Sequence, residues 1–296
     1  MSTARSRDLG PQLALLRQGV GFTTTTLAGR IGTGAPTVSK AENGLRTLSE
    51  VKLIQYLTFC GLQANEIGPY LDLARRPDDG YHLSAFNGRM GDELIALVVH
   101  ETTAQTIQEY ECAVIPGLLQ AHDYTDALIR EAGLVPADEI ETKVQRRINR
   151  QSILRQVNPP RSTFFIYEGV LRSIVGGSKI MNDQMMHLQF VSEWPGCSIR
   201  VVPMADYSRP GVTGAFRLMT FAEHGPVAMQ SLMTAMVFAE KADDIALYGD
   251  ALKRIDRFAL NEGRSTALIA SLADEYSRMG AGQHERGGDV DHVAKE

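Results

Sequence analysis

Residues 23–46, TTTTLAGRIGTGAPTVSKAENGLR, decide the fold of the N-terminal part of the chain. Thr23 is a good N-cap for a short helix, and Gly32 is a good residue to end it. Pro36 suits the first turn of a second helix, which ends at Asn43-Gly44 because that pair tolerates left-handed backbone. The apolar residues of the two helices are Leu27, Ala28, Ile31, Val38 and Ala41. The stretch therefore predicts two short helices joined by a tight turn.

Two short helices joined in this way form the layout of a helix-turn-helix, whose second helix lies in the major groove of DNA. The expected recognition helix spans about residues 35–43. Its residues Thr37, Ser39 and Lys40 face outward and can reach base edges. The alternative is a plain helical bundle in which Asn43-Gly44 is no more than a helix cap.

The same stretch resembles the Xre family, the lambda-repressor-like helix-turn-helix regulators. The residues that carry the resemblance are Thr23, Leu27, Ala28, Gly32, Val38, Ser39, Lys40, Glu42, Asn43 and Gly44. Two residues depart from the family pattern: Thr24 stands in place of the usual Gln, and Ala41 in place of a large aliphatic residue.

This resemblance implies which residues contact DNA. The residues at base-reading positions are Ala35, Pro36, Thr37 and Lys40. The residues at positions that hold the DNA backbone are Thr24, Asn43 and Arg46. Together with Thr33 in the turn, these residues are the candidate DNA-binding site.

The residues on either side complete a five-helix domain over residues 1–76. Leu9, Leu13 and Leu16 mark a helix before the stretch, and a helix over about 65–75 closes the domain. A helix capped by Ser49 comes between, with expected apolar positions Val51, Ile54 and Leu57. The domain has nine basic and five acidic side chains, a balance of about +4, against about −9 for the rest of the chain. A basic domain on an acidic body suits approach to a polyanion.

The composition changes beyond residue 76. Residues 77–90 predict a linker, 91–276 a second domain, and 277–296, which are poor in apolar residues, a disordered tail. Periodicity predicts helices over 91–111, 116–130, 138–157, 182–194 and 243–259. β-Branched and aromatic runs predict strands over 163–168, 198–203, 215–221 and 227–233. The expected fold class is a mainly α N-terminal domain followed by an α+β domain, in which helices precede a small, mostly antiparallel sheet.

The second domain resembles the domain that follows the helix-turn-helix in many actinomycete regulators. The resemblance is carried by Glu101, Ala104, Ile107, Tyr110-Glu111, VIPGLLQ at 114–120, Tyr124, Arg146-Arg147, FIYE at 165–168, Leu171-Arg172, VGG at 175–177, His187-Leu188, Val202-Pro203, Gly211, Gly214, Phe216 and Phe258. Cys112 and Ala121 depart from the usual proline and threonine. That family is described as an antitoxin-like domain of unknown function, whose genes commonly lie beside a gene for a small partner protein.

The VIPGLLQ element has two interpretations. Its proline at a helix start and its leucine pair predict a structural corner, but the same corner could bind a partner protein or an effector. Glu168, at the end of an apolar strand, is either a solvated strand end or a ligand contact. The candidate partner- or effector-binding residues are Pro116, Leu118, Leu119 and Glu168.

Several function classes find no support in the sequence. A content of 44% hydrophobic and 22% charged residues argues against a disordered or a membrane protein. The seven His and three Cys lack metal-ligand spacing, and no P-loop or nucleophile elbow is present. We therefore expect no metal, no cofactor and no enzymatic activity. With no export signal, we expect reduced cysteines and a cytoplasmic protein, at the nucleoid when it is bound to DNA.

The sequence leaves two hypotheses of function. The first is a sequence-specific transcriptional regulator that binds double-stranded DNA as a homodimer, with the second domain supplying dimer contacts and sensing a partner protein or small-molecule effector. The second is an antitoxin-like interaction protein that sequesters a small partner encoded beside it, with autoregulatory DNA binding.

Overall fold

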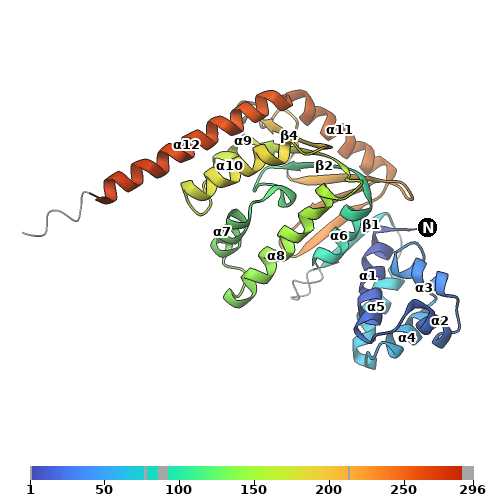
Figure 1. Cartoon of the computed structure of the whole chain (residues 1–296). Coiled ribbons are helices and arrows are strands. Elements are labelled where there is room, and N and C mark those ends of the chain that lie inside the picture. Colours follow the sequence, from blue (N-terminus) through green and yellow to red (C-terminus); the bar gives the residue numbers. More distant parts are fainter. Residues whose placement is uncertain (1, 77–78, 86–92, 213, 289–296) are drawn as a thin grey trace, which may run out of the picture. The chain divides into compact units, whose positions relative to one another are not determined.

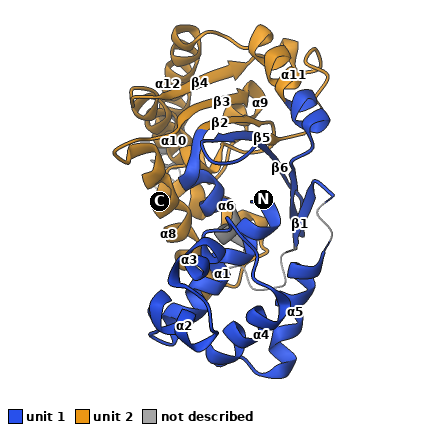
Figure 2. Ribbon diagram, turned by 90° about the vertical axis from the view of Figure 1, so that its right-hand side faces the viewer, with its two compact units in different colours: residues 1–105, 218–248 blue, residues 106–217, 249–296 orange. Residues whose placement is uncertain are grey.

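The computed structural model describes residues 2–76, 79–85, 93–212 and 214–288. The chain forms two compact units, drawn in blue and orange in Figure 2. The first unit consists of Met1–Gln105 and Leu218–Tyr248, and the second of Thr106–Arg217 and Gly249–Glu296. Each unit therefore combines two separate stretches of the chain, and the first extends beyond the segment expected as the helix-turn-helix domain.

Five helices open the first unit (blue to cyan in Figure 1), as the sequence predicts. They are α1 (Ala4–Gly19), α2 (Thr24–Arg30), α3 (Ala35–Glu42), α4 (Glu50–Phe59) and α5 (Ala64–Arg75). The hydroxyls of Thr3 and Thr23 cap α1 and α2 by accepting backbone N–H groups at 3.2 and 3.0 Å. The core shared by the five helices includes Leu13, Leu27, Val38, Leu53, Tyr56 and Leu57.

Helix α4 turns a different face inward from the one expected. Val51 and Ile54 are 66% and 36% exposed, whereas Leu53 and Tyr56 are fully buried. The buried residues follow the helical series Leu53, Tyr56, Leu57 and Cys60. The expected inward placement of Val51 and Ile54 is wrong, because a helix with apolar residues on two sides can be interpreted in two phases, and packing selects one.

The first unit also contains strands and a sixth helix. These elements are β1 (Tyr81–Ala85), α6 (Glu93–Thr103), β6 (Val227–Ser231) and β7 (Ala235–Ala239). Strand β7 pairs with β1 on one side and β6 on the other, antiparallel in both cases, so that Ala239 lies opposite Tyr81 and Ala228. Helix α1 packs against both α6 and β1. The five-helix bundle is thus joined to part of a sheet within one unit.

Strand β1 lies inside the segment expected as a linker. Its hydrophobic residues Tyr81 and Leu83 are 46% and 47% exposed, while His82 and Ser84 are buried. This alternation is the reverse of the apolar-in, polar-out pattern by which a half-buried strand is recognised. The rest of the expected linker, residues 77–78 and 86–90, lies outside the described residues.

The second unit has a parallel core. Strands β2 (Ala104–Glu111), β3 (Arg161–Tyr167) and β4 (Cys197–Val202) pair in parallel. Helix α10 (Ser178–Ser192) packs along α12 (Glu262–Gly288), and both contact β4. The other helices are α7 (His122–Ala132), α8 (Ile140–Arg150), α9 (Glu168–Arg172), α11 (Ala242–Phe258), and the short 3₁₀ turns Gly117–Leu119, Ala137–Glu139, Gln151–Arg155 and Met204–Asp206.

The expected long helix over 91–111 is wrong. The chain is helical to Thr103 and then continues as strand β2. Residues 104–111, AQTIQEYE, gain a complete parallel ladder with β3, from Thr106 opposite Arg161 to Glu111 opposite Ile166. The helical periodicity of 94–107 did not reveal this strand, because the pairing partner lies some fifty residues further along the chain.

The α+β class is confirmed, and the sheet is mixed. Its seven strands, which include β5 (Phe216–Phe221), follow the order β1-β7-β6-β5-β2-β3-β4. Helix α12 continues to Gly288, so residues 277–288, expected as a disordered tail, are helical. Residues 289–296 of that expected tail lie outside the described residues.

Substitution of Gly44 tests how closely α1 packs on the end of the recognition helix. A Cβ there would lie 2.6 Å from the Arg7 Cα, and Gly44 has a φ of +67°. We expect Gly44→Ala to reduce the free energy of unfolding by about 3 kcal/mol or more, because it combines backbone strain with a clash against main chain. Urea denaturation measures this loss.

Gly21→Ala is the matched control. Gly21 has a φ of +71°, but a Cβ there would have no neighbouring atom within 4 Å, so the substitution introduces strain without a clash. Its expected loss is about 1 kcal/mol. Equal losses for the two variants would contradict the close packing.

Candidate nucleic-acid interface

The turn between α2 and α3 is held by a glycine and a lysine. Gly32 adopts a left-handed φ of 64°. The Lys52 Nζ on α4 donates to the carbonyl oxygens of Ile31 and Gly32, each at 2.8 Å. These carbonyls belong to the C-terminal end of α2, where backbone acceptors lack helical partners. Pro36 lies in the first turn of α3, as expected. Lys52 therefore fixes the angle at which α3 leaves the turn.

The candidate DNA contacts all lie on this motif, with their side chains at least partly exposed. The exposed ones are Pro36, Lys40, Asn43 and Arg46. The half-buried ones are Thr24, Thr33, Ala35 and Thr37. Neither Lys40 nor Arg46 forms an ion pair with any described residue. Their charges are therefore available to an external polyanion.

A buried ion pair holds the other side of α3. Arg17 on α1 donates to both carboxylate oxygens of Glu42, from Nε at 2.7 Å and Nη2 at 2.8 Å. The Tyr56 hydroxyl donates to the same carboxylate at 2.6 Å. Hydrogen bonding to Glu42 raises the pKa of Arg17, and burial raises the pKa of Tyr56. This bidentate contact orients the recognition helix from within the bundle.

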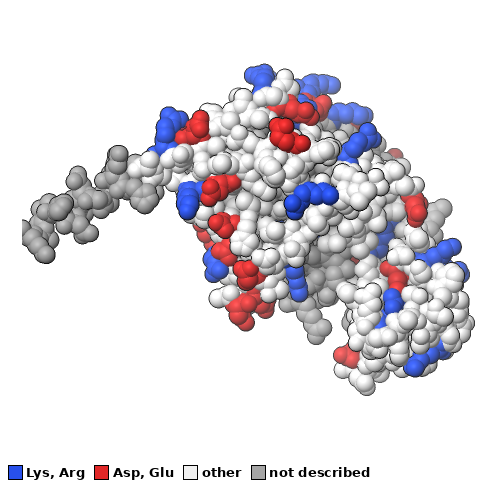
Figure 3. Space-filling view, in the orientation of Figure 1, with Lys and Arg blue, Asp and Glu red and all other residues white. Residues whose placement is uncertain are grey.

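The bundle surface carries charged side chains of both signs. Figure 3 shows Lys and Arg side chains, with some Asp and Glu side chains between them, on a mostly uncharged surface over α1–α5. Arg30, at the end of α2, lies over the rings of Phe22 and Phe59, 4.3 and 5.6 Å from their centroids. In such contacts a cation is attracted to the ring faces and covers its apolar neighbours.

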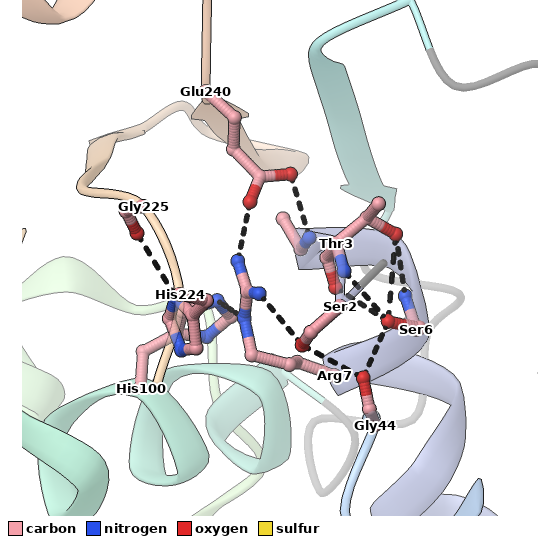
Figure 4. A network of polar contacts seen from close by, with 10 residues as sticks. Ser2, Thr3, Ser6, Arg7, Gly44, His100, His224, Gly225 and Glu240 are labelled. Carbon is pink, nitrogen blue, oxygen red and sulfur yellow. Dashed lines mark hydrogen bonds and ion pairs between the residues drawn. The ribbon is translucent and has the colours of Figure 1, made fainter. Parts of the chain in front are cut away.

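The end of the recognition helix is fastened to the start of α1. The hydroxyls of Ser2 and Ser6 both donate to the Gly44 carbonyl, at 2.8 and 2.7 Å (Figure 4). The Arg7 Nη1 donates in turn to the Ser2 hydroxyl at 3.0 Å. Gly10 meets the Ala41 carbonyl so closely that a Cβ would lie 2.6 Å away. Helix α1 therefore packs directly against the C-terminal end of α3 and supports it.

Glu240, at the end of β7, holds α1 from the opposite direction. Its carboxylate accepts from the Ala4 backbone N–H at 2.7 Å and from the Arg7 Nη2 at 2.5 Å (Figure 4). A carboxylate at a helix N-terminus also interacts favourably with the helix dipole. The Arg7 side chain is 2% exposed and that of Glu240 19%. This pair connects the helix-turn-helix to the sheet within the first unit.

Two imidazoles reinforce this connection. The Arg7 Nε donates to the His100 Nε2 at 3.1 Å, and the His82 Nε2 lies 2.7 Å from the Asp8 carboxylate. The Phe238 ring stacks with His82 at 5.9 Å and with His100 at 4.8 Å between centroids. Because arginine can only donate, His100 accepts through an unprotonated nitrogen. Arg7 and Asp8, which are consecutive in α1, therefore each bind a histidine, and both histidine rings stack on Phe238.

We call the set Arg7, Asp8, His82, His100 and Glu240 the docking network. None of these five residues was among the candidate site residues expected from the sequence. Arg7 and Asp8 are 2% and 4% exposed, although charged residues near a chain end ordinarily lie in solvent. One signal was present in the sequence: His82 lies in a segment where polar and apolar residues alternate. That pattern indicates a buried histidine only once β1 is known to pair with β7.

The VIPGLLQ element forms a buried corner of the second unit. Leu118 and Leu119 are fully buried, and Pro116 is buried too. The Gln120 side-chain amide donates to the Ile115 carbonyl at 2.7 Å. The Gln151 side-chain amide donates to the backbone carbonyl of Gln120, also at 2.7 Å. The Gln184 side chain accepts from the Ala121 N–H and donates to the Leu119 carbonyl. The three glutamines satisfy the backbone of the corner, and the leucine side chains present no surface to a partner in this conformation.

Glu168 lies at a different place in the second unit. It follows β3 and accepts from the Arg172 Nε at 2.8 Å and from the Met204 backbone N–H at 3.0 Å. No hydrogen bond or ion pair among the described residues joins it to the VIPGLLQ corner. The structure therefore does not bring the four candidate partner-binding residues together. Across the described ranges, no group of three His, Cys, Asp or Glu residues could hold a metal ion.

Removal of the Glu42 carboxylate tests the internal support of α3. We expect Glu42→Ala to lower the free energy of unfolding by about 3–5 kcal/mol, because it leaves the Arg17 guanidinium buried without its carboxylate. Urea denaturation measures the loss. The control is Glu50→Ala, which removes an exposed pair with Arg75 and should change stability far less. Comparable losses would show that Glu42 does not support the helix.

A double-mutant cycle tests the docking network. We expect Arg7→Met and Glu240→Gln to be coupled by about 2 kcal/mol in the free energy of unfolding, since the bond is charge-assisted and buried. The same cycle on the exposed pair Arg130 and Asp126 of α7 should give little coupling. Additive losses at Arg7 and Glu240 would argue against a direct interaction.

Comparisons with known proteins agree with this arrangement. Residues 8–68 match the model of a helix-turn-helix domain, and residues 94–271, more than half of the chain, match that of a domain of unknown function, DUF5753. A search of curated proteins finds no match. No helix in the described part of the chain has the length and apolar character needed to cross a bilayer. Because the second match covers most of the chain beyond the recognition motif, the protein belongs to the DUF5753 family, with a helix-turn-helix domain at its N-terminal side.

Proposed function

We propose that this protein is a sequence-specific transcriptional regulator of the Xre type, which binds operator DNA as a homodimer through α3. The helix-turn-helix domain supports DNA binding and transcription regulation. The observation that carries the proposal is an exposed recognition helix whose Lys40 is unpaired among the described residues and whose inner face is held by Glu42. A rigid helix with a free outer face can enter the major groove without rearrangement.

The proposal divides the DNA contacts by chemistry. Lys40 and Thr37 read base edges, and the exposed Pro36 and half-buried Ala35 offer apolar contact to thymine methyl groups. Asn43, Arg46, Thr24 and Thr33 hold phosphates. A homodimer presents one α3 to each half-site, with half-sites about 34 Å apart on the DNA.

The DUF5753 domain, in this proposal, supplies the dimer contact and senses a partner protein or a small ligand. Within the first unit, Glu240 at the end of β7 binds Arg7, Arg7 donates to the Ser2 hydroxyl, and Ser2 donates to the Gly44 carbonyl just beyond α3. A change at β7 therefore has a continuous path of polar contacts to the recognition helix. The proposal assigns no catalytic reaction to the protein and locates its action in the cytoplasm, at the nucleoid.

Selection of genomic fragments by the purified protein tests this function. We expect an enriched palindrome at about 150 mM salt, near physiological ionic strength, with the protein alone. The selection is repeated with the product of a small neighbouring gene, the partner that the antitoxin-like alternative requires. No enrichment without that protein, together with a stable complex with it, would replace the proposal by the antitoxin-like function.

Single substitutions distinguish base readers from phosphate contacts. We expect Lys40→Ala to weaken operator binding by about 1–3 kcal/mol and to relax the preference at one base position. We expect Arg46→Ala to weaken binding to operator and random DNA alike and to reduce the salt slope by about one. Fluorescence anisotropy titrations at several salt concentrations measure both effects.

Lys253→Ala serves as the control for these titrations. Lys253 is exposed on α11, outside the helix-turn-helix, and pairs with Asp250. This variant should bind DNA as the wild type does. If Lys40→Ala lost affinity equally for operator and random DNA, its role as a base reader would be refuted. If Arg46→Ala lost affinity for the operator alone, its role as a phosphate contact would be refuted.

A further inference from the structure

Helix α10 of the second unit has an exposed stripe that its own fold does not use. The stripe consists of Lys179, Asp183, Met186, Phe190 and Glu193 at the end of the helix, all exposed. They follow one another at alternating intervals of four and three residues, the spacing of the contact seam in a pair of packed helices. The opposite face of α10, which contains Met181, Met185 and Leu188, is fully buried. Helix α10 therefore presents a second packing face to the outside.

The centre of the stripe is apolar. Met186 is 57% exposed and Phe190 is 63% exposed. The Phe190 ring contacts Trp194 edge-on at 5.7 Å, and the Arg155 guanidinium lies 5.1 Å from the Trp194 ring centroid. Contiguous exposed apolar residues with a polar rim are typical of protein–protein contacts. Aromatic residues, Met and Arg are the types enriched at the centre of such contacts.

The charges at the two ends of the stripe favour a second copy of the same helix in one orientation. Lys179 lies seven residues before Met186, and Glu193 lies seven residues after it. In an antiparallel pair related by a two-fold axis at Met186, each Lys179 faces the Glu193 of the other copy. In a parallel pair, each of these charges would face its own like charge, which is unfavourable. Neither side chain forms an ion pair with the described residues of its own chain.

We propose that α10 is the homodimer contact of this protein, packed antiparallel against α10 of a second copy and centred on Met186. This inference rests on the proposed function, since it supplies the dimer that an operator with two half-sites requires. Two helices of this length form a contact at the low end of interface sizes, so the dissociation constant is measured over a wide range of protein concentrations.

Charge exchange at the ends of the stripe tests this contact. Sedimentation velocity over a range of concentrations measures the dimer dissociation constant of the full chain. We expect Lys179→Glu and Glu193→Lys each to raise it about tenfold, because two attractive end contacts become repulsive. Met186→Asp should abolish the dimer, because it introduces a charge beside its own copy at the two-fold axis.

Two restorations make the test specific. The double variant with both exchanges should return the dissociation constant to within about threefold of the wild type, because each end again meets an opposite charge. A mixture of the two single variants should associate as well as the wild type, because the acidic ends of one copy meet the basic ends of the other. Lys253→Glu on α11 makes the same charge change outside the stripe and should leave the dimer unchanged. Circular dichroism and thermal midpoints establish that each variant is folded.

The outcomes separate this inference from the proposed function. A wild-type protein that stays monomeric both free and on DNA would overturn the inference, as would single variants that dimerise normally or a double variant as weak as the singles. Operator binding by the wild type together with insensitivity to these exchanges would place the dimer contact elsewhere and leave the proposed function standing. The expected pattern of exchanges without any DNA binding would support the α10 contact and remove the proposed function.

Discussion

The ion pair between Arg7 and Glu240 is the contact on which the organisation of the first unit depends. Glu240 binds both the N-terminus and the first turn of α1, and α1 in turn backs the recognition helix through Ser6 and Gly44. The Asp8–His82 bond and the packing of α1 against α6 and β1 act beside this contact. Together they join the bundle, β1, β7 and α6 in one compact unit. The orientation of α3 is therefore set by a strand end as well as by its own turn.

The stability of the bundle and its orientation have different physical sources. Burial of residues such as Leu13, Leu27 and Tyr56 supplies most of the favourable free energy, since apolar burial is the largest favourable contribution to folding. Buried ion pairs contribute less, because desolvation offsets much of their attraction. Their geometry is directional, however, and the bidentate contact between Arg17 and Glu42 is met in one arrangement of α1 and α3. The apolar core holds the helices together, and the polar contacts select how they cross.

The features that could be predicted from the sequence have local signals, and those that could not be predicted depend on distant residues. The Thr23 cap, the turn at Gly32 and the proline of α3 are properties of neighbouring residues, and all three were found. Ser49 stands at the N-cap of α4 as expected but makes no side-chain cap hydrogen bond there, and the Thr3 cap of α1 was missed. Strand β1 was missed because its buried residues are His82 and Ser84, which look like surface residues until Asp8 and Phe238 cover His82. Strand β2 was taken for the end of a helix because its ladder comes from β3, far along the chain. The phase of α4 was misjudged because apolar residues occur on both of its sides.

The sequence by itself determined that residues 23–46 form a helix-turn-helix and which of its side chains point outward, because caps, turns and helical periodicity act within a few residues. It also determined an α+β second domain. The tertiary structure decided what holds this motif: Arg7 meets Glu240 across 233 positions of sequence, and Asp8 meets His82 across 74. Such pairs have no signature in either segment alone, because a buried charge is favourable only once its partner is in place.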